Sequence, residues 1–173
     1  MTVPAAEATP GAPTYWTSVD SPVGPLLLAG DRDTLRVLWF GRGRRTQGPD
    51  PAWTESADRF RGIASQLREY FAGRRTRFEM ALAPAGTPFQ QRVWQALLDI
   101  PYGETTTYGE LARRLGDVKA TRAVGLANGA NPIAIVIPCH RVIGAGGALT
   151  GFGGGLPTKR ALLDLEQGQR TLL

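Results

Sequence analysis

The sequence predicts an α+β protein, because strand patterns fill its first half and helical patterns its second. Three short apolar stretches separated by turn residues, typical of a β-meander, cover Tyr15–Val19, Leu26–Ala29 and Leu35–Phe40. From Pro84 onward, apolar residues recur at helical spacing between prolines and glycines. Strands collected in one half and helices in the other favour the α+β class.

The length of the chain limits the number of domains. A chain of 173 residues fits one large or two small domains. We expect a tail over residues 1–13, an N-terminal domain over 14–83 and a C-terminal domain over 84–173. The tail is rich in Ala, Pro, Thr and Gly, cannot bury much apolar surface and is expected to be mobile.

Charge and cysteine content indicate the compartment and the kind of partner. A formal net charge of +5 and a pI near 10.0 favour a polyanion such as nucleic acid. No run approaches the ~20 apolar residues of a membrane span, and the first residues lack the pattern of a secretory signal. A single cysteine cannot form an internal disulfide, which suits the reducing cytoplasm. One cysteine and one histidine also cannot build the usual Cys/His zinc site.

The rest of the first half is predicted to contain one helix and one more strand. Arg42–Arg45 opens a polar loop, which is interpreted as solvated rather than as a phosphate contact. Apolar residues at helical spacing predict an amphipathic helix over Ala57–Phe71, with Gly73 as its C-cap. Alternating residues then predict a strand over Phe78–Ala83. Nothing in this half carries recognisable chemistry.

Helices are predicted through most of the second half. Thr87 and Pro88 suit the start of a helix that runs to Ile100. A last helix is predicted from Pro157 through Glu166, where leucines recur at helical spacing.

Two short helices between these are typical of a helix-turn-helix, with an ordinary helical hairpin as the alternative. They are predicted over Thr107–Leu115 and Ala120–Asn128, joined by a turn that contains Gly116. The second helix is slim because most of its residues are Ala or Gly, and Arg122 is its one long cation. Close approach of a backbone together with one projecting arginine fits insertion into a groove of DNA.

The only cysteine, Cys139, and the only histidine, His140, stand side by side after an apolar run. Residues Ile133–Ile137 predict a buried strand or extended segment that Pro138 ends. A lone cysteine is most often an inert small hydrophobe. Adjacency of the two, beside Arg141 and after a proline, favours reactive groups at the rim of a rigid element instead. On a strand the two side chains would point to opposite faces unless the chain turns there.

Two glycine-rich loops follow, Gly144–Gly147 and Gly151–Gly155. Neither has the spacing of a phosphate-cradling loop, so no nucleotide cofactor is expected. The loops are either flexible turns or a pocket wall where backbone groups meet a flat ligand.

Taken together, the second half resembles the O6-alkylguanine-DNA alkyltransferases, also called methylated-DNA–protein-cysteine methyltransferases. The similarity covers roughly Pro88 to Glu166, whereas the N-terminal half is only loosely similar. The order and spacing of the matching motifs make the resemblance specific. These motifs are Pro88-Phe89-Gln90, Ile100-Pro101-Tyr102-Gly103-Glu104-Thr105, Tyr108-Gly109-Glu110-Leu111-Ala112, Arg122-Ala123-Val124-Gly125, Asn131-Pro132, Pro138-Cys139-His140-Arg141-Val142 and Gly153-Gly154.

The resemblance implies a small α/β, ribonuclease H-like N-terminal domain and a helical C-terminal domain with a winged helix-turn-helix. It implies direct-reversal DNA repair, in which Cys139 irreversibly takes the alkyl group from O6-alkylguanine, once per protein molecule. His140 would accept the thiol proton through a water, and Glu166 would orient and stabilise His140. Asn131 would hold the turn of the site. No metal and no cofactor would take part.

The implied partner is double-stranded DNA that carries O6-alkylguanine, bound through its minor groove by a monomer, with cooperative binding left open. Arg122 would fill the hole left by the flipped nucleotide. Tyr108 would donate a hydrogen bond as the guanine leaves and would press on the DNA backbone. Thr107, Ala123 and Gly125 complete the implied DNA-binding set.

The implied substrate pocket contains Val142, Phe152, Gly153 and Lys159. The backbone carbonyls of Val142 and Cys139 would meet the exocyclic amine, and the N–H of Gly153 would face O6. Phe152 stands where many members carry tyrosine, so a stacking wall remains without its hydroxyl. Gly153 replaces a residue with a side chain in some relatives, which would widen the pocket for larger alkyl groups.

Three other functions stay open on the sequence. A lesion sensor would bind flipped alkylguanine, but relatives of that kind replace the cysteine that is present here. A transcriptional regulator would use Ala120–Asn128 as a recognition helix, although this helix is poor in the residues that read base edges. A cysteine hydrolase would need an acyl-transfer oxyanion site, and its turnover would distinguish it from a protein that reacts once.

Overall fold

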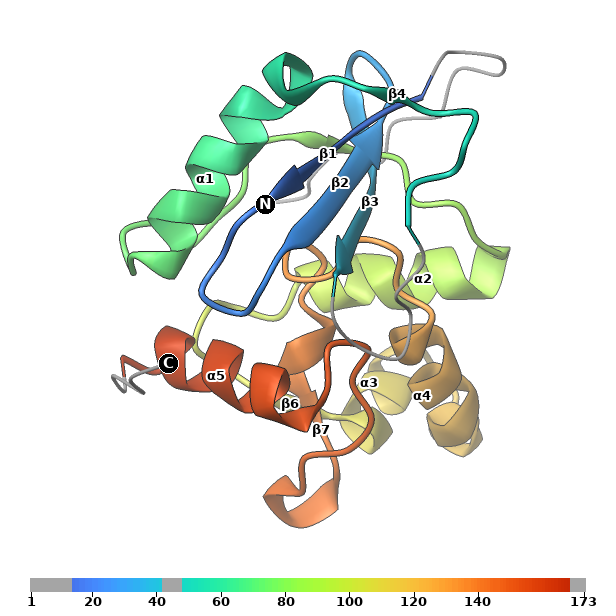
Figure 1. The fold of residues 1–173 in the computed structure, drawn as a ribbon. Helices are drawn as coiled ribbons and strands as arrows, with labels where there is room; N and C mark the ends of the chain where they lie inside the picture. The colour runs from blue at the N-terminus through green and yellow to red at the C-terminus, as the bar shows by residue number, and fades with distance from the viewer. Residues whose placement is uncertain (1–13, 42–47, 169–173) are drawn as a thin grey trace.

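The α+β class is confirmed by the arrangement of sheet and helices. The computed structural model describes residues 14–41 and 48–168. The predicted tail over residues 1–13 and the predicted loop Arg42–Arg45 lie outside the described residues. Figure 1 shows a sheet with one helix beside it in the N-terminal part, and a group of helices at the other end of the molecule.

The N-terminal part is a five-stranded sheet in the order β4-β1-β2-β3-β5. Strands β1 (Tyr15–Val19), β2 (Leu26–Gly30) and β3 (Thr34–Phe40) form the predicted antiparallel meander. Two strands of two residues each, β4 (Thr54–Glu55) and β5 (Ala81–Leu82), pair in parallel with β1 and β3. The strand predicted over Phe78–Ala83 is therefore wrong except near its end, where Ala81–Leu82 forms β5.

Helix α1 (Arg61–Phe71) lies beside this sheet and buries its apolar face (Figure 1). The helix predicted over Ala57–Phe71 starts as a 3-10 turn over Ala57–Phe60 and continues as α1. Three buried residues, Ala64, Leu67 and Tyr70, follow one another at spacings of three residues on its inner face. Tyr70 is completely buried, although it carries a hydroxyl group that needs a hydrogen-bond partner.

The C-terminal part is mainly helical, as predicted. Its helices are α2 (Pro88–Leu98), α3 (Tyr108–Arg114), α4 (Thr121–Gly129) and α5 (Leu156–Glu166). A short parallel pair is formed by β6 (Thr106–Thr107) and β7 (Val142–Ile143), and single 3-10 turns cover Val118–Ala120, Cys139–Arg141 and Ala145–Gly147. Capping boxes of Thr87 with Gln90 and Thr107 with Glu110 start α2 and α3. None of the helices in the described part of the chain is long and apolar enough to span a bilayer.

The strand predicted over Ile133–Ile137 is wrong, because this buried segment is a turn. Ile137 N donates to Ile133 O at 3.0 Å, which folds the backbone back on itself, and Ile135 has a φ of 69°. A β-branched residue rarely adopts this left-handed conformation, so the surrounding packing imposes it. An apolar run of this length fits a buried strand and a buried turn equally well, and the periodicity cannot distinguish them.

This turn joins the two parts of the molecule through the backbone. Leu38 of β3 donates its N–H to Pro132 O at 2.9 Å and accepts from Ala134 N at 3.0 Å, in a single parallel bridge. The N-terminal sheet thus holds the segment that leads to Cys139.

Candidate active site and DNA-binding surface

Asn131 holds the turn that leads to Cys139. Its Nδ2 donates to Ile137 O at 2.8 Å, and its Oδ1 accepts from Ile133 N at 2.9 Å. One buried amide thereby joins both ends of the turn. After Pro138 the chain winds into the 3-10 turn Cys139–Arg141, so Cys139 and His140 do not alternate across a strand.

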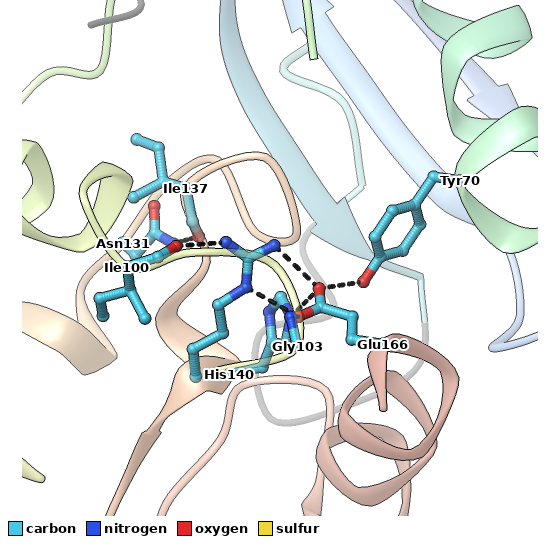
Figure 2. Close-up of polar contacts among 8 residues, drawn as sticks. Tyr70, Ile100, Gly103, Asn131, Ile137, His140 and Glu166 are labelled. Carbon is cyan, nitrogen blue, oxygen red and sulfur yellow. Dashed lines mark hydrogen bonds and ion pairs between the residues drawn. The ribbon is translucent and has the colours of Figure 1, made fainter. Parts of the chain in front are cut away.

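Glu166, at the end of α5, binds His140 in a buried cluster of charged and polar groups (Figure 2). The distance between His140 Nε2 and Glu166 Oε1 is 2.7 Å. Arg141 also binds this carboxylate, through Nε to Oε2 at 2.8 Å and through Nη2 to Oε1 at 3.0 Å, and donates from Nη1 to Ile100 O at 2.6 Å. Two more donors reach Glu166, the Tyr70 hydroxyl at 2.7 Å and the Gly103 N–H at 3.2 Å.

These contacts determine which groups carry protons. Burial by itself would raise the pKa of Glu166, but the hydrogen bonds from His140 and Arg141, together with the positive charge of Arg141, hold it well below its ordinary value. Burial lowers the pKa of His140, although Glu166 opposes this shift. The stable pair is therefore a carboxylate and a neutral imidazole that carries its proton on Nε2, facing Glu166.

The other ring nitrogen of His140 is available as a base. Nδ1 is buried and has no hydrogen-bond partner among the described residues. Burial raises the pKa of the Cys139 thiol, while the Asn131 amide and the charge of Lys159 partly oppose the rise. The resting site thus contains a thiol on the residue that precedes a neutral base in the chain, so a thiolate forms only when the thiol proton moves.

A pocket opens beside Cys139, between the N-terminal sheet and the glycine-rich loop. Its lining includes Cys139, Phe152 and Gly153 as predicted, together with Trp39 and Phe40 of β3. Asn128 and Asn131 also line it. The rings of Phe40 and Phe152 meet edge to face at 5.4 Å.

Gly154 is required by the close packing of this loop. A Cβ on Gly154 would lie 2.7 Å from a ring carbon of Phe40, whereas a Cβ on Gly153 would meet nothing within 4 Å. The glycine-rich loop is therefore a pocket wall pressed against β3, and it is not only a flexible turn.

Two predicted pocket residues, Val142 and Lys159, do not line the pocket among the described residues. Lys159 is completely buried, and its Nζ donates to Val142 O at 2.6 Å and to Thr150 O at 3.0 Å. The ammonium group thereby ties the end of the Cys139 segment to the loop that carries Phe152.

The predicted DNA-binding residues lie on α3 and α4 and before them. Arg122 and Ala123 are exposed on α4, and Arg122 makes no hydrogen bond or ion pair with the described residues. Gly125 lies opposite the half-buried Tyr108, since a Cβ there would be 3.7 Å from its ring. The small residue lets α4 pack closely on the start of α3, where Thr107 is the N-cap.

Tyr108 lies near the pocket loop, outside the pocket lining described above. Its hydroxyl is 3.4 Å from Thr150 Oγ1, and Lys159 Nζ lies 6.0 Å from the centre of its ring. In the contact with Thr150 the tyrosine oxygen accepts, so the O–H of Tyr108 is available to donate a hydrogen bond elsewhere.

Three residues of the site escaped the sequence analysis. Arg141 was noted only as a neighbour of Cys139 and His140, and its ion pair with Glu166 was not anticipated. Its place two residues after Cys139 was the available signal that it belongs to the site. Asn128 was placed only at the end of a helix, yet its Nδ2 lies 3.4 Å from Cys139 O and its buried Oδ1 has no partner among the described residues. Tyr70 gave no signal at all, because it lies 96 residues from Glu166.

No three His, Cys, Asp or Glu side chains gather as a metal site within residues 14–41 and 48–168. The absence of a metal from the reaction stays a prediction.

Comparisons with known proteins agree with this geometry. Residues 14–84 match the family model described as "6-O-methylguanine DNA methyltransferase, ribonuclease-like domain", and residues 88–168 match the "DNA binding domain" model of the same family. A methylated-DNA–protein-cysteine methyltransferase of Methanosarcina acetivorans is 53% identical over 152 residues, which cover 88% of this chain and 97% of the relative. The protein of that name from Mycobacterium bovis is 54% identical over 156 residues, covering 90% and 93%.

A solved structure extends the similarity to three dimensions. The crystal structure of Mycobacterium tuberculosis OGT in complex with DNA is 53% identical and superposes with a TM-score of 0.84, covering 90% of this chain and 94% of that one. The two family models together span nearly all of the described residues. Because these two models and relatives that are more than half identical cover most of the chain, the chain belongs to the 6-O-methylguanine DNA methyltransferase family.

Proposed function

We propose that this protein repairs DNA by moving the alkyl group of O6-alkylguanine onto Cys139. The observation that carries the proposal is the state of His140, the residue next to Cys139 in the chain. Its Nδ1 is buried without a partner among the described residues, and its Nε2 is bound to the Glu166 carboxylate. Such an arrangement accepts a proton at one nitrogen and stabilises the resulting charge through the other.

The reaction is a single displacement at the alkyl carbon. The thiol proton of Cys139 passes to His140 Nδ1, through a water by analogy with the family, and leaves a thiolate. The sulfur then forms a bond to the alkyl carbon while the bond from that carbon to O6 breaks. The guanine leaves as an anion and gains a proton, for which Tyr108 is the proposed donor. No electron is gained or lost overall, so the balance requires neither a metal nor a cofactor.

The reaction ends with a thioether on Cys139. A thioether is a poor leaving group, and the proposed scheme contains no step that regenerates the thiol. Each protein molecule is therefore expected to react once.

The walls of the pocket support a flat purine as substrate. Phe152 and Phe40 offer aromatic surface, and Gly153, which also lines the pocket, is proposed to donate its backbone N–H to O6. Val142 O and Cys139 O are proposed to accept from the exocyclic amine, with Lys159 holding the first of these carbonyls in place.

DNA is the partner, and we propose that α3 and α4 bind it through the minor groove. Arg122 is exposed and has no hydrogen bond or ion pair with the part of the chain that the structure describes, which supports the role of a side chain that replaces the flipped nucleotide in the stack. Ala123 and Gly125 have small side chains, so the backbone of α4 can approach DNA closely, and Thr107 stands at the start of the neighbouring helix α3.

A monomer in the cytoplasm is the form that we expect to act, with cooperativity on DNA open. The matches over residues 14–84 and 88–168 support a division into domains near residue 84.

The experiment is intact-mass analysis after mixing the protein with duplex DNA that carries one O6-methylguanine. We expect the wild type to gain about 14 Da, one hydrogen replaced by a methyl group, and to stop at one equivalent. Cys139→Ser should gain nothing. Tight binding to the lesion without any mass change would refute the transfer and would indicate a lesion sensor.

A further inference from the structure

Tyr70 carries the one hydroxyl group that the N-terminal part delivers to the Glu166 cluster. It lies in the last turn of α1 and is completely buried. Its Oη donates to Glu166 Oε1 at 2.7 Å, across a sequence separation of 96 residues (Figure 2). The ring is fixed by aromatic neighbours, with Phe71 at 5.3 Å, Phe78 at 5.4 Å and Tyr102 at 6.1 Å between ring centres.

The oxygen that Tyr70 binds is the oxygen that binds His140. Oε1 accepts from the Tyr70 hydroxyl, from His140 Nε2 at 2.7 Å and from Arg141 Nη2 at 3.0 Å. A carboxylate oxygen has about two lone-pair sites, so these donors compete for its charge. Each additional donor weakens the attraction of Glu166 for the proton on the imidazole.

We propose that Tyr70 is a positioning residue for alkyl transfer, which fixes the Glu166 carboxylate and keeps His140 neutral and able to accept a proton. The proposal rests on the proposed function and deepens it. Under this proposal the N-terminal part contributes to alkyl transfer through Tyr70. The backbone bridge at Leu38 is a second contribution of the N-terminal part to the site.

The charged and titratable groups around the pair are known. Arg141 faces Glu166 from the Cys139 turn, Tyr102 lies beside the cluster, and the charge of Lys159 also acts on His140 and on Cys139. The pKa of Tyr70 itself is raised well above its ordinary value by burial and by Glu166. Its hydroxyl therefore keeps its proton over the usual pH range, and Tyr70 cannot be the group that titrates.

The test is Tyr70→Phe, with Tyr102→Phe as the matched control. Both variants keep an aromatic ring in the same cluster, but the Tyr102 hydroxyl makes no hydrogen bond with the described residues. The rate of methyl uptake from an O6-methylguanine duplex is measured by intact mass at closely spaced values between about pH 5 and 9, a range that includes the ordinary pKa of histidine. Affinity for the duplex and the melting temperature are measured in parallel.

We expect Tyr70→Phe to raise the pKa of the acid limb by about half a unit to one unit, because a more basic Glu166 makes His140 easier to protonate. At neutral pH the rate should fall about three- to tenfold, since the carboxylate loses one of its anchors. Duplex affinity should not change, because Tyr70 is buried. Tyr102→Phe should follow the wild type in both respects.

A second readout does not depend on turnover or on small losses of stability. The chain contains a single histidine, so the ring nitrogens of His140 give one pair of resonances in ¹⁵N-histidine-labelled protein without a tag. We expect Nε2 protonated and Nδ1 unprotonated in the wild type, and an upward shift of the His140 titration in Tyr70→Phe, recorded at low temperature.

The proposal is overturned if Tyr70→Phe leaves the acid limb and the His140 resonances unchanged, even if its melting temperature falls. Such a result would make the tyrosine a purely structural residue. Failure of the proposed function is a different result, because the wild type would then gain no mass from the alkylated duplex.

Discussion

Replacing Glu166 with glutamine should destabilise the fold and slow the reaction together. The carboxylate accepts one hydrogen bond each from Tyr70, His140 and Gly103 and two from Arg141. Glutamine keeps the shape, but one of its terminal atoms becomes an NH₂ group that cannot accept a hydrogen bond. The negative charge opposite Arg141 also disappears.

The magnitude follows from the burial of the ion pair. Arg141 is only 7% exposed, so it would become a buried cation without its counter-charge. Removing one partner of a buried pair costs about 3–5 kcal/mol, out of the ~5–15 kcal/mol that is typical of a folded protein. At ~2–4 °C per kcal/mol for a chain of this length, the midpoint of thermal unfolding should fall by about 6–20 °C.

Thermal unfolding followed by circular dichroism at pH 7 measures this effect, and intact mass at low temperature measures methyl uptake by the still-folded variant. We expect uptake to slow at least about a hundredfold, the low end of what a positioned proton acceptor contributes. Glu79→Gln is the control, because Glu79 is exposed and its carboxylate makes no ion pair with the described residues. A midpoint for Glu166→Gln within about 2 °C of the wild type would refute the assigned charge balance.

Three further predictions concern DNA binding, loop packing and acid stability. Arg122→Ala should weaken binding to an alkylated duplex by ~1–3 kcal/mol and leave the reaction with free O6-benzylguanine intact, and equal losses on both substrates would exclude its role at the DNA. Gly154→Ala should lower the free energy of unfolding, measured in urea, by about 1–3 kcal/mol, because its Cβ would lie 2.7 Å from a ring carbon of Phe40. Gly153→Ala should match the wild type, since its Cβ would meet nothing within 4 Å. Similar free energies for both variants would contradict the described packing of the loop. Since the folded-state pKa of Glu166 lies below its unfolded value of about 4.3, the stability that it contributes is complete above that pH and is lost as the pH falls toward the folded value. Acid titration of stability should therefore be shallower in Glu166→Gln, and parallel curves would argue against this linkage.

The elements that the sequence predicted well have strong local signals. β1 has the bounds predicted for it, and β2, β3 and α2–α5 start and end within a few residues of the predicted positions. Thr87 and Thr107 cap their helices through side-chain contacts only three residues away, which a sequence displays directly.

The elements that the sequence analysis missed or placed poorly depend on distant partners. β4 and β5 consist of two residues each and exist only because β1 and β3 offer free edges. The Ile133–Ile137 segment is a turn because Asn131 and Leu38 hold it, and neither contact is visible in a run of apolar residues. Local patterns do not encode such contacts, so tertiary structure decides them.

The candidate site shows the same division. Cys139 and His140 stood out as neighbours, whereas the meeting of His140 with Glu166 came from the resemblance to a family. The ion pair of Arg141 with Glu166 and the hydrogen bond from Tyr70 bring residues together over separations of 25 and 96 positions. Composition and periodicity carry no information on contacts at this range.

The bridge between Leu38 and the turn before Cys139 also protects an exposed sheet edge. β5 covers β3 only at Thr34 and Leu35, and the next backbone groups of β3 are satisfied by Pro132 and Ala134. Until the ribosome has passed residue 134, this edge is open to strand addition by another chain, which is a common start of aggregation. The nascent protein therefore completes its sheet only when the segment that leads to Cys139 has been synthesised. A chain truncated before that point would keep an unpaired strand edge that is prone to aggregation.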